Sequence, residues 1–162
     1  MKSNQTLQPQ AGETLENMLS LPNTEALCQA SVLDQSTESS TLELAEIAGF
    51  DEAQLRESLT AVSSDPKEAL SLLLETYLAD ADSLLTQIRK SIETVDFETL
   101  RFASHTLKSS SALMGIMKLS ELCRQLEHCA REQNQDSLTS LLEQAETVQS
   151  QSQKLLLSYQ PS

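Results

Sequence analysis

From Asp65 to Leu157, apolar residues recur at spacings of three and four, which is the period of one face of an α-helix. Residues that would interrupt such helices are scarce, because the 162-residue chain holds only three glycines and four prolines. Leu, Ala, Glu and Gln, which are good helix formers, are abundant, as is Ser. The apolar pattern and the backbone preferences therefore agree, and we predict an all-α protein.

Local start and stop signals divide this pattern into four long helices. Asp65 and Pro66 form an N-cap followed by proline at the first helical position, and Asp96 is placed to cap the next helix. Gly115 marks a turn or kink after that second helix. The predicted helices cover residues 66 to about 92, 97 to about 114, 116 to about 132, and about 137 to 157. Because short connections place consecutive helices side by side, we predict an antiparallel four-helix bundle with its core at 65–157.

Shorter elements precede the bundle. The apolar pattern after Thr41 predicts a short helix ending at Gly49, and Asp51 is placed to cap a second one. We assign both to the same domain as the bundle, residues 41–160. Residues 1–40 are polar and acidic, and their apolar runs are too short for stable isolated helices, so we predict a largely flexible leader or linker. The alternatives are that this leader docks on the bundle or inhibits its working surface.

Charge and cysteine content narrow the choice of partners. The net charge of −13 makes nucleic acids and anionic membranes poor partners. Residues 1–64 carry ten acidic and two basic residues, whereas residues 96–133 carry five of each, so we expect an acid-poor working surface in the second segment. No run of eighteen apolar residues exists, so we expect no membrane insertion. Three cysteines without metal-ligand spacing indicate reduced thiols, a cytoplasmic location and no metal site.

The second predicted helix carries His105, one of only two histidines. Its apolar stripe is expected to face the core and comprises Leu100, Ala103, Leu107, Ser111 and Met114. His105 projects about 140° away from Leu100, and Lys108 lies beside it at i+3. An exposed imidazole titrates near neutrality and can act as a nucleophile, while a neighbouring lysine would balance the charge of a phosphoryl group. The pattern therefore favours phosphoryl transfer to the histidine.

At these residues the chain resembles the histidine-containing phosphotransfer (HPt) domains of phosphorelays. The resemblance rests on S-H-T-L-K-S-S-S-A-L-M-G at residues 104–115 and on L-S-E-L-C-R-Q-L-E at residues 119–127. It covers about residues 65–157 as a combined pattern. Ser104 replaces the usual alanine and Ser109 replaces a common glycine, and both side chains are small.

The resemblance implies an HPt-like bundle that accepts a phosphoryl group on His105 from a receiver-domain aspartyl phosphate and passes it to another receiver. Lys108 would assist, and Gly115 would form the structural turn. The surface expected to dock the receiver comprises Arg101, Phe102, Ser109 and Ala112. The expected partners are response-regulator receivers and a hybrid sensor kinase, with Mg²⁺ held by the receiver and no cofactor in this chain. We expect a monomer.

The sequence is also compatible with two other interpretations. The bundle could serve as a scaffold or binding module that is never phosphorylated, and Phe102 could belong to the core. His128 is interpreted as an ordinary surface histidine among long charged side chains, which are Arg124, Glu127, Arg131 and Glu132. No Gly-rich phosphate loop, HExxH or GxSxG motif occurs in the sequence. We therefore expect a stoichiometric carrier rather than an enzyme with its own ATP site.

Overall fold

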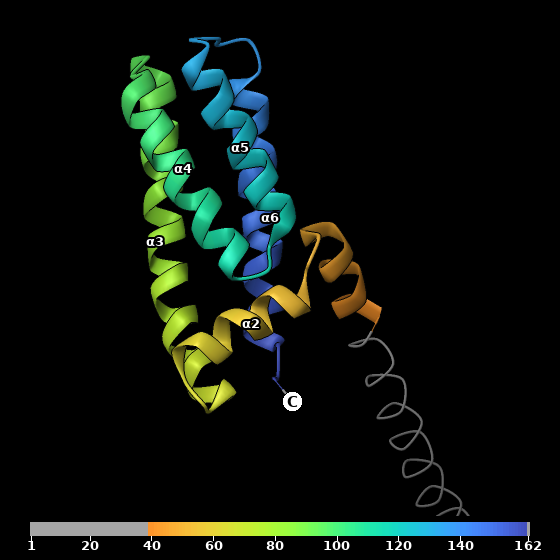
Figure 1. Ribbon diagram of the computed structural model, residues 1–162. Helices are drawn as coiled ribbons and strands as arrows, with labels where there is room; N and C mark the ends of the chain where they lie inside the picture. The colour runs from red at the N-terminus through yellow and green to blue at the C-terminus, as the bar shows by residue number, and fades with distance from the viewer. Residues whose placement is uncertain (1–38, 162) are drawn as a thin grey trace, which may run out of the picture. The chain divides into compact units, whose positions relative to one another are not determined.

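The computed structural model describes residues 39–161, and its main body is a bundle of four long helices (Figure 1). These are α3 (Pro66–Thr94), α4 (Phe97–Leu113), α5 (Met117–Arg131) and α6 (Leu138–Ser158). Successive helices run in opposite directions along the bundle. The prediction of an all-α antiparallel four-helix bundle is confirmed. Of the predicted leader, residues 1–38 lie outside the part of the chain that the structure describes.

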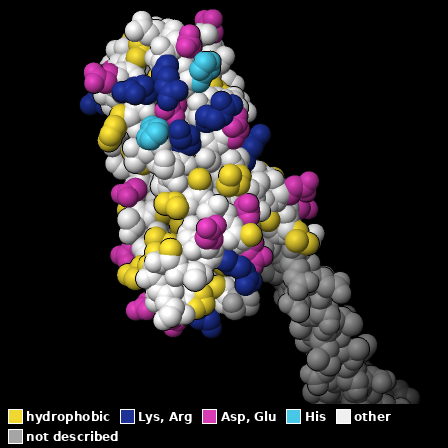
Figure 2. All heavy atoms as spheres, in the orientation of Figure 1, with side chains coloured by type: hydrophobic (Ala, Val, Ile, Leu, Met, Phe, Trp, Pro, Cys, Tyr) yellow, Lys and Arg dark blue, Asp and Glu magenta, His cyan; other side chains and the backbone are white. Residues whose placement is uncertain are grey.

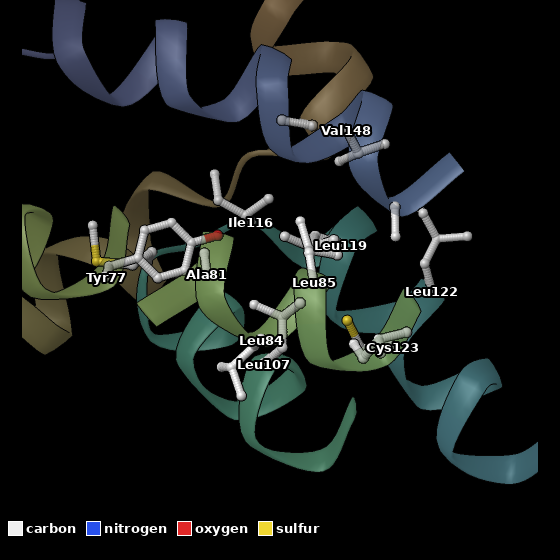
Figure 3. Packing of buried hydrophobic residues seen from close by; sticks show 14 of the residues in the cluster. Tyr77, Ala81, Leu84, Leu85, Leu107, Ile116, Leu119, Leu122, Cys123 and Val148 are labelled. Atoms are coloured by element: carbon white, nitrogen blue, oxygen red, sulfur yellow. The ribbon is translucent and has the colours of Figure 1, made fainter. Parts of the chain in front are cut away.

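The four helices pack as a closed ring around one core. α3 and α5 each pack against both α4 and α6. Figure 3 shows apolar side chains from all four helices meeting between them. Those labelled include Leu84 and Leu85 of α3, Leu107 of α4, Leu122 of α5 and Val148 of α6. Burial of this shared apolar surface is the main stabilising contribution to such a bundle.

The predicted capping residues begin their helices as expected. The Asp65 carboxylate accepts hydrogen bonds from the backbone N–H groups of Lys67 and Glu68, at 2.9 and 3.4 Å. The Asp96 carboxylate accepts from the N–H of Thr99 at 3.0 Å and thereby fixes the start of α4. Each cap satisfies N–H groups that the helix itself leaves without partners.

A short helix covers one end of the bundle. Residues 39–48 are helical, and α2 (Glu52–Val62) follows after Gly49, with Asp51 as its N-cap. α2 packs against α3 and α4 and buries Leu55 and Leu59. Within residues 39–161 the only β-type pairing is an isolated bridge between Phe50 and Ile116. Among the described helices, none is long and apolar enough to cross a membrane.

The turn between α4 and α5 is held by the segment before α2. Gly115 has a φ of +73°, and its carbonyl accepts a hydrogen bond of 2.8 Å from the N–H of Asp51. A Cβ at position 115 would lie 2.4 Å from the Asp51 carbonyl oxygen. Both the positive φ and the close approach therefore require glycine here. The turn sets how α4 and α5 lie against each other.

Candidate functional site

α4 presents His105 on the surface because its opposite face is buried. Leu100, Ala103 and Leu107 are at most 1% exposed, whereas the His105 side chain is 60% exposed. Ser104 is also fully buried, so His105 directly follows two buried residues, Ala103 and Ser104. The apolar stripe of α4 thus fixes the rotation of the helix and displays the imidazole to solvent.

α5 brings a glutamate against this histidine. Oε1 of Glu127 lies 3.2 Å from Nδ1 of His105, and Lys108 Nζ donates a 2.7 Å hydrogen bond to Oε2. Arg131, one turn along α5, donates to Oε1. The Glu127 side chain is only 3% exposed, so both carboxylate oxygens are occupied by basic partners in a nearly dry position.

This placement corrects the expectation that Glu127 is one of the surface side chains around His128. The expected acid-poor surface around His105 does contain this one carboxylate. α5 turns Glu127 toward α4, and its carboxylate lies next to the imidazole. A signal was present, because Glu127 lies four residues after buried Cys123 and three before buried Ala130, on the same helix face. Glutamate is usually exposed to solvent, and this general preference led to the wrong prediction that Glu127 lies at the surface.

The carboxyl group of Glu127 is held in its ionised form. Burial raises its pKa, but hydrogen bonds from Lys108 and His105, together with the charges of Lys108 and Arg131, outweigh that effect. The net result is a pKa below the ordinary value for glutamate. The site therefore contains a fixed negative charge surrounded by three basic side chains.

The negative charge of Glu127 indicates which ring nitrogen of His105 carries the proton. A neutral imidazole carries one proton, so Nδ1 either donates to Glu127 or accepts from Lys108, whose Nζ lies 3.4 Å away. A carboxylate can only accept, and its oxygen is the nearer atom, so we assign the proton to Nδ1. Nε2 then keeps its lone pair and is the ring nitrogen free to act as a nucleophile.

The other predicted site residues all belong to α4 and differ in how exposed they are. Ser109 is exposed, and its hydroxyl donates 3.1 Å to the His105 carbonyl, while Ala112 is half-buried. Phe102 is 67% exposed, which excludes the alternative that it belongs to the core. Arg101 is exposed one turn before His105. Exposed apolar side chains beside a polar centre are suited to contact with another protein.

Basic side chains gather around the site. In Figure 2, both histidines lie among Lys and Arg side chains in the upper half of the visible face, whereas acidic and hydrophobic side chains dominate the lower half. α4 and α5 carry the basic residues Arg101, Lys108, Lys118, Arg124 and Arg131. Of these, Lys108 and Arg131 contact the Glu127 carboxylate beside His105.

Two further residues lack the features of a reactive site. His128 is exposed on α5, as expected for a surface histidine. Cys123 is fully buried, and burial raises the pKa of its thiol to about 12, so it is a poor nucleophile.

In the described residues, no group of three or more His, Cys, Asp or Glu side chains is arranged to hold a metal ion.

Comparisons with known proteins agree on one family. The sequence model of the Hpt domain matches residues 72–156. Multistep phosphorelay regulator 1 of Schizosaccharomyces pombe is 25% identical over 77 residues, which is 48% of this chain and 26% of that protein. The match thus spans about a quarter of the relative's length. The crystal structure of histidine-containing phosphotransfer protein B (HptB) from Pseudomonas aeruginosa PAO1 is similar, with a TM-score of 0.61 and 25% identity, over 67% of this chain and 90% of that chain.

Proposed function

The chain belongs to the Hpt domain family, and from this premise we infer that it carries a phosphoryl group on His105 between the receiver domains of a phosphorelay. The observation that carries the proposal is the state of His105. It is exposed within the segment that matches the family, with Nδ1 occupied by Glu127, Nε2 free and Lys108 beside it. No other histidine in the described residues has a buried carboxylate on one ring nitrogen.

The proposed transfer forms one bond and breaks one bond. Nε2 of His105 attacks the phosphorus of a receiver's aspartyl phosphate and forms the P–N bond. The P–O bond to the aspartate breaks, and its electron pair leaves with the carboxylate oxygen. The proton on Nδ1 stays on the ring, where Glu127 balances the positive charge that develops. Lys108 provides a cation near the incoming phosphoryl group.

The partner supplies the remaining parts of the reaction. We propose that a receiver domain contributes the acidic pocket and its Mg²⁺, and that it docks on Arg101, Phe102, Ser109 and Ala112 of α4. A hybrid sensor kinase would be the source of the phosphoryl group and a response regulator its destination. The name of the S. pombe relative supports a multistep relay. In this role the chain would be a cytoplasmic, monomeric and stoichiometric carrier, in which each molecule carries one phosphoryl group at a time.

Phosphate transfer from a receiver to two histidine variants tests the proposal. A receiver phosphorylated with ³²P is mixed with the wild-type chain, His105→Gln, and the matched control His128→Gln. We expect label on the wild type and on His128→Gln, stable to base and lost in acid, and none on His105→Gln. Label retained by His105→Gln would refute the assignment. If several receivers leave every variant unlabelled, with the helical fold verified by circular dichroism, the chain is a non-phosphorylated scaffold.

A further inference from the structure

Three polar side chains from three different helices meet inside the core of the bundle. Tyr77 of α3 and Gln149 of α6 are 4% and 3% exposed, and Ser111 of α4 is fully buried. The Tyr77 hydroxyl donates a 2.8 Å hydrogen bond to Oε1 of Gln149. Figure 3 shows the Tyr77 ring among apolar side chains of the core. Polar groups in such surroundings are costly unless their donors and acceptors are satisfied.

Two atoms of this cluster have no hydrogen-bond partner within the described residues. They are Oγ of Ser111 and Nε2 of Gln149. Exchanging the two ends of the Gln149 amide would not help, because the Tyr77 hydroxyl can bond to either end and the other end stays unpaired. The helix does not satisfy Ser111 either. The buried serines Ser91 and Ser152 each donate a 2.7 Å hydrogen bond to the carbonyl four residues earlier, whereas Ser111 makes no such bond.

Both residues with an unpaired atom adjoin the Tyr77 hydroxyl. Gln149 accepts its proton, and Ser111 lies close enough to affect the pKa of the Tyr77 phenol, which burial raises and the Ser111 hydroxyl lowers in part. Nε2 of Gln149 is a donor that lacks an acceptor, and a serine hydroxyl can accept as well as donate. A water molecule beside Tyr77 would accept from Nε2 and donate to Oγ, and would thus satisfy both atoms.

A polar groove between α3 and α6 brings solvent close to the same cluster. The groove has a volume of about 330 Å³, and the residues that line it include Asp82, Arg89, Glu146 and Gln149. Gln149 therefore contacts the groove on the surface and the Tyr77 hydroxyl in the core. A water molecule at the inner end of this groove reaches the cluster without separation of the helices.

We propose that the bundle binds one structural water molecule at this cluster, held by Nε2 of Gln149, Oγ of Ser111 and the Tyr77 hydroxyl. The water joins α4 to α6, two helices that lie diagonally across the bundle and do not pack directly against each other in residues 39–161. It contacts the buried face of α4, away from His105, and so helps to fix the rotation of the helix that displays this histidine.

Contacts between water and the Gln149 side-chain amide test the proposal directly. In the full-length ¹⁵N-labelled chain, NOE and ROE cross-peaks of opposite sign between the Gln149 amide protons and water identify a water molecule that the protein retains. We expect these cross-peaks in the wild type and in the control variant Ser104→Ala, and their loss in Ser111→Ala. Their absence from the wild type, or their persistence in Ser111→Ala, overturns the proposal.

Stability gives a second readout, with Ser104 as the matched control. Both serines are fully buried on α4 with unpaired hydroxyls, but Ser104 lies two turns before Ser111. We expect the midpoint of urea denaturation to fall by about 0.5 M in Ser111→Ala, which removes a partner of the water, and to rise in Ser104→Ala. A rise in both variants overturns the proposal. Neither result depends on whether His105 accepts a phosphoryl group, so failure of the proposed function is recognised separately.

Discussion

At the residue scale, a buried serine beside the site is an unsatisfied polar group. Ser104 is fully buried, and its hydroxyl has no hydrogen-bond partner in the described residues. Leaving such a group without a partner costs about 1 kcal/mol or more. We therefore expect Ser104→Ala to raise the free energy of unfolding by about 1 kcal/mol, measured by urea denaturation.

The matched control for this change is Ser109→Ala. Its hydroxyl is exposed and donates to the His105 carbonyl, so its removal should change the free energy of unfolding by less than about 0.5 kcal/mol. Since Ser104 turns inward, phosphorylation of His105 should persist in Ser104→Ala. A loss of stability in Ser104→Ala would mean that the hydroxyl does find a partner.

The residue scale is also where sequence reasoning was least complete. The exposure of His105 follows from the spacing of its own helix and was predictable from it. The contact with Glu127 depends on how α5 rotates against α4, which no pattern within either segment specifies. A glutamate is expected at the surface by type, so only the helix-face position shared with Cys123 could have indicated its burial.

At the scale of elements, most of the fold could be predicted because its signals are local. Asp65 and Asp96 cap their helices in the structure as the sequence indicated. The predicted end of α3, about residue 92, lies two residues before its observed end at Thr94. Helix ends fray and their signals are weak, so errors of this size are expected. Roles for the first 38 residues remain predictions.

The connection between α4 and α5 yields a test at this scale. Gly115→Ala forces a Cβ into a backbone with φ of +73° and to within 2.4 Å of the Asp51 carbonyl oxygen. We expect a loss of roughly 2 to 4 kcal/mol in the free energy of unfolding, because conformational strain and overpacking add. Urea denaturation of the full chain measures it.

Gly49 provides the matched control for this turn. It also has a positive φ, of +57°, but a Cβ there would meet the Lys118 backbone nitrogen at 3.3 Å, a much milder contact. Gly49→Ala should therefore cost only about 1 kcal/mol, mainly from conformational strain. Equal losses in the two variants would show that the approach of Asp51 to the turn contributes nothing.

At the scale of the whole molecule, the net negative charge opposes folding at neutral pH, whereas a few carboxylates with basic or hydrogen-bonding partners favour it. The net charge of −13 produces self-repulsion in the compact state. Against this, the pKa values of Glu52, Asp96, Glu121 and Glu127 lie below their ordinary values, and that of Glu121 falls to about 2 because of Arg124 and Gln125. Glu52 and Glu121 are about half exposed, so solvent screening weakens their contributions.

The sign of the pH dependence follows from these lowered pKa values. A carboxyl group with a lower pKa when folded stabilises the protein fully above its unfolded pKa, near 4.5 for glutamate, and loses that contribution as pH falls through its folded pKa. We therefore expect the contribution of these carboxyl groups to the free energy of unfolding to be lost from about pH 4.5 toward pH 2. Urea denaturation at a series of pH values measures this loss as the difference between the wild type and a variant that lacks one of the groups. Because Glu127 is the buried member, Glu127→Gln should flatten this decline more than Glu121→Gln does. An acid decline of the same steepness in Glu127→Gln and the wild type would contradict the assignment of an ionised carboxylate to the centre of the site.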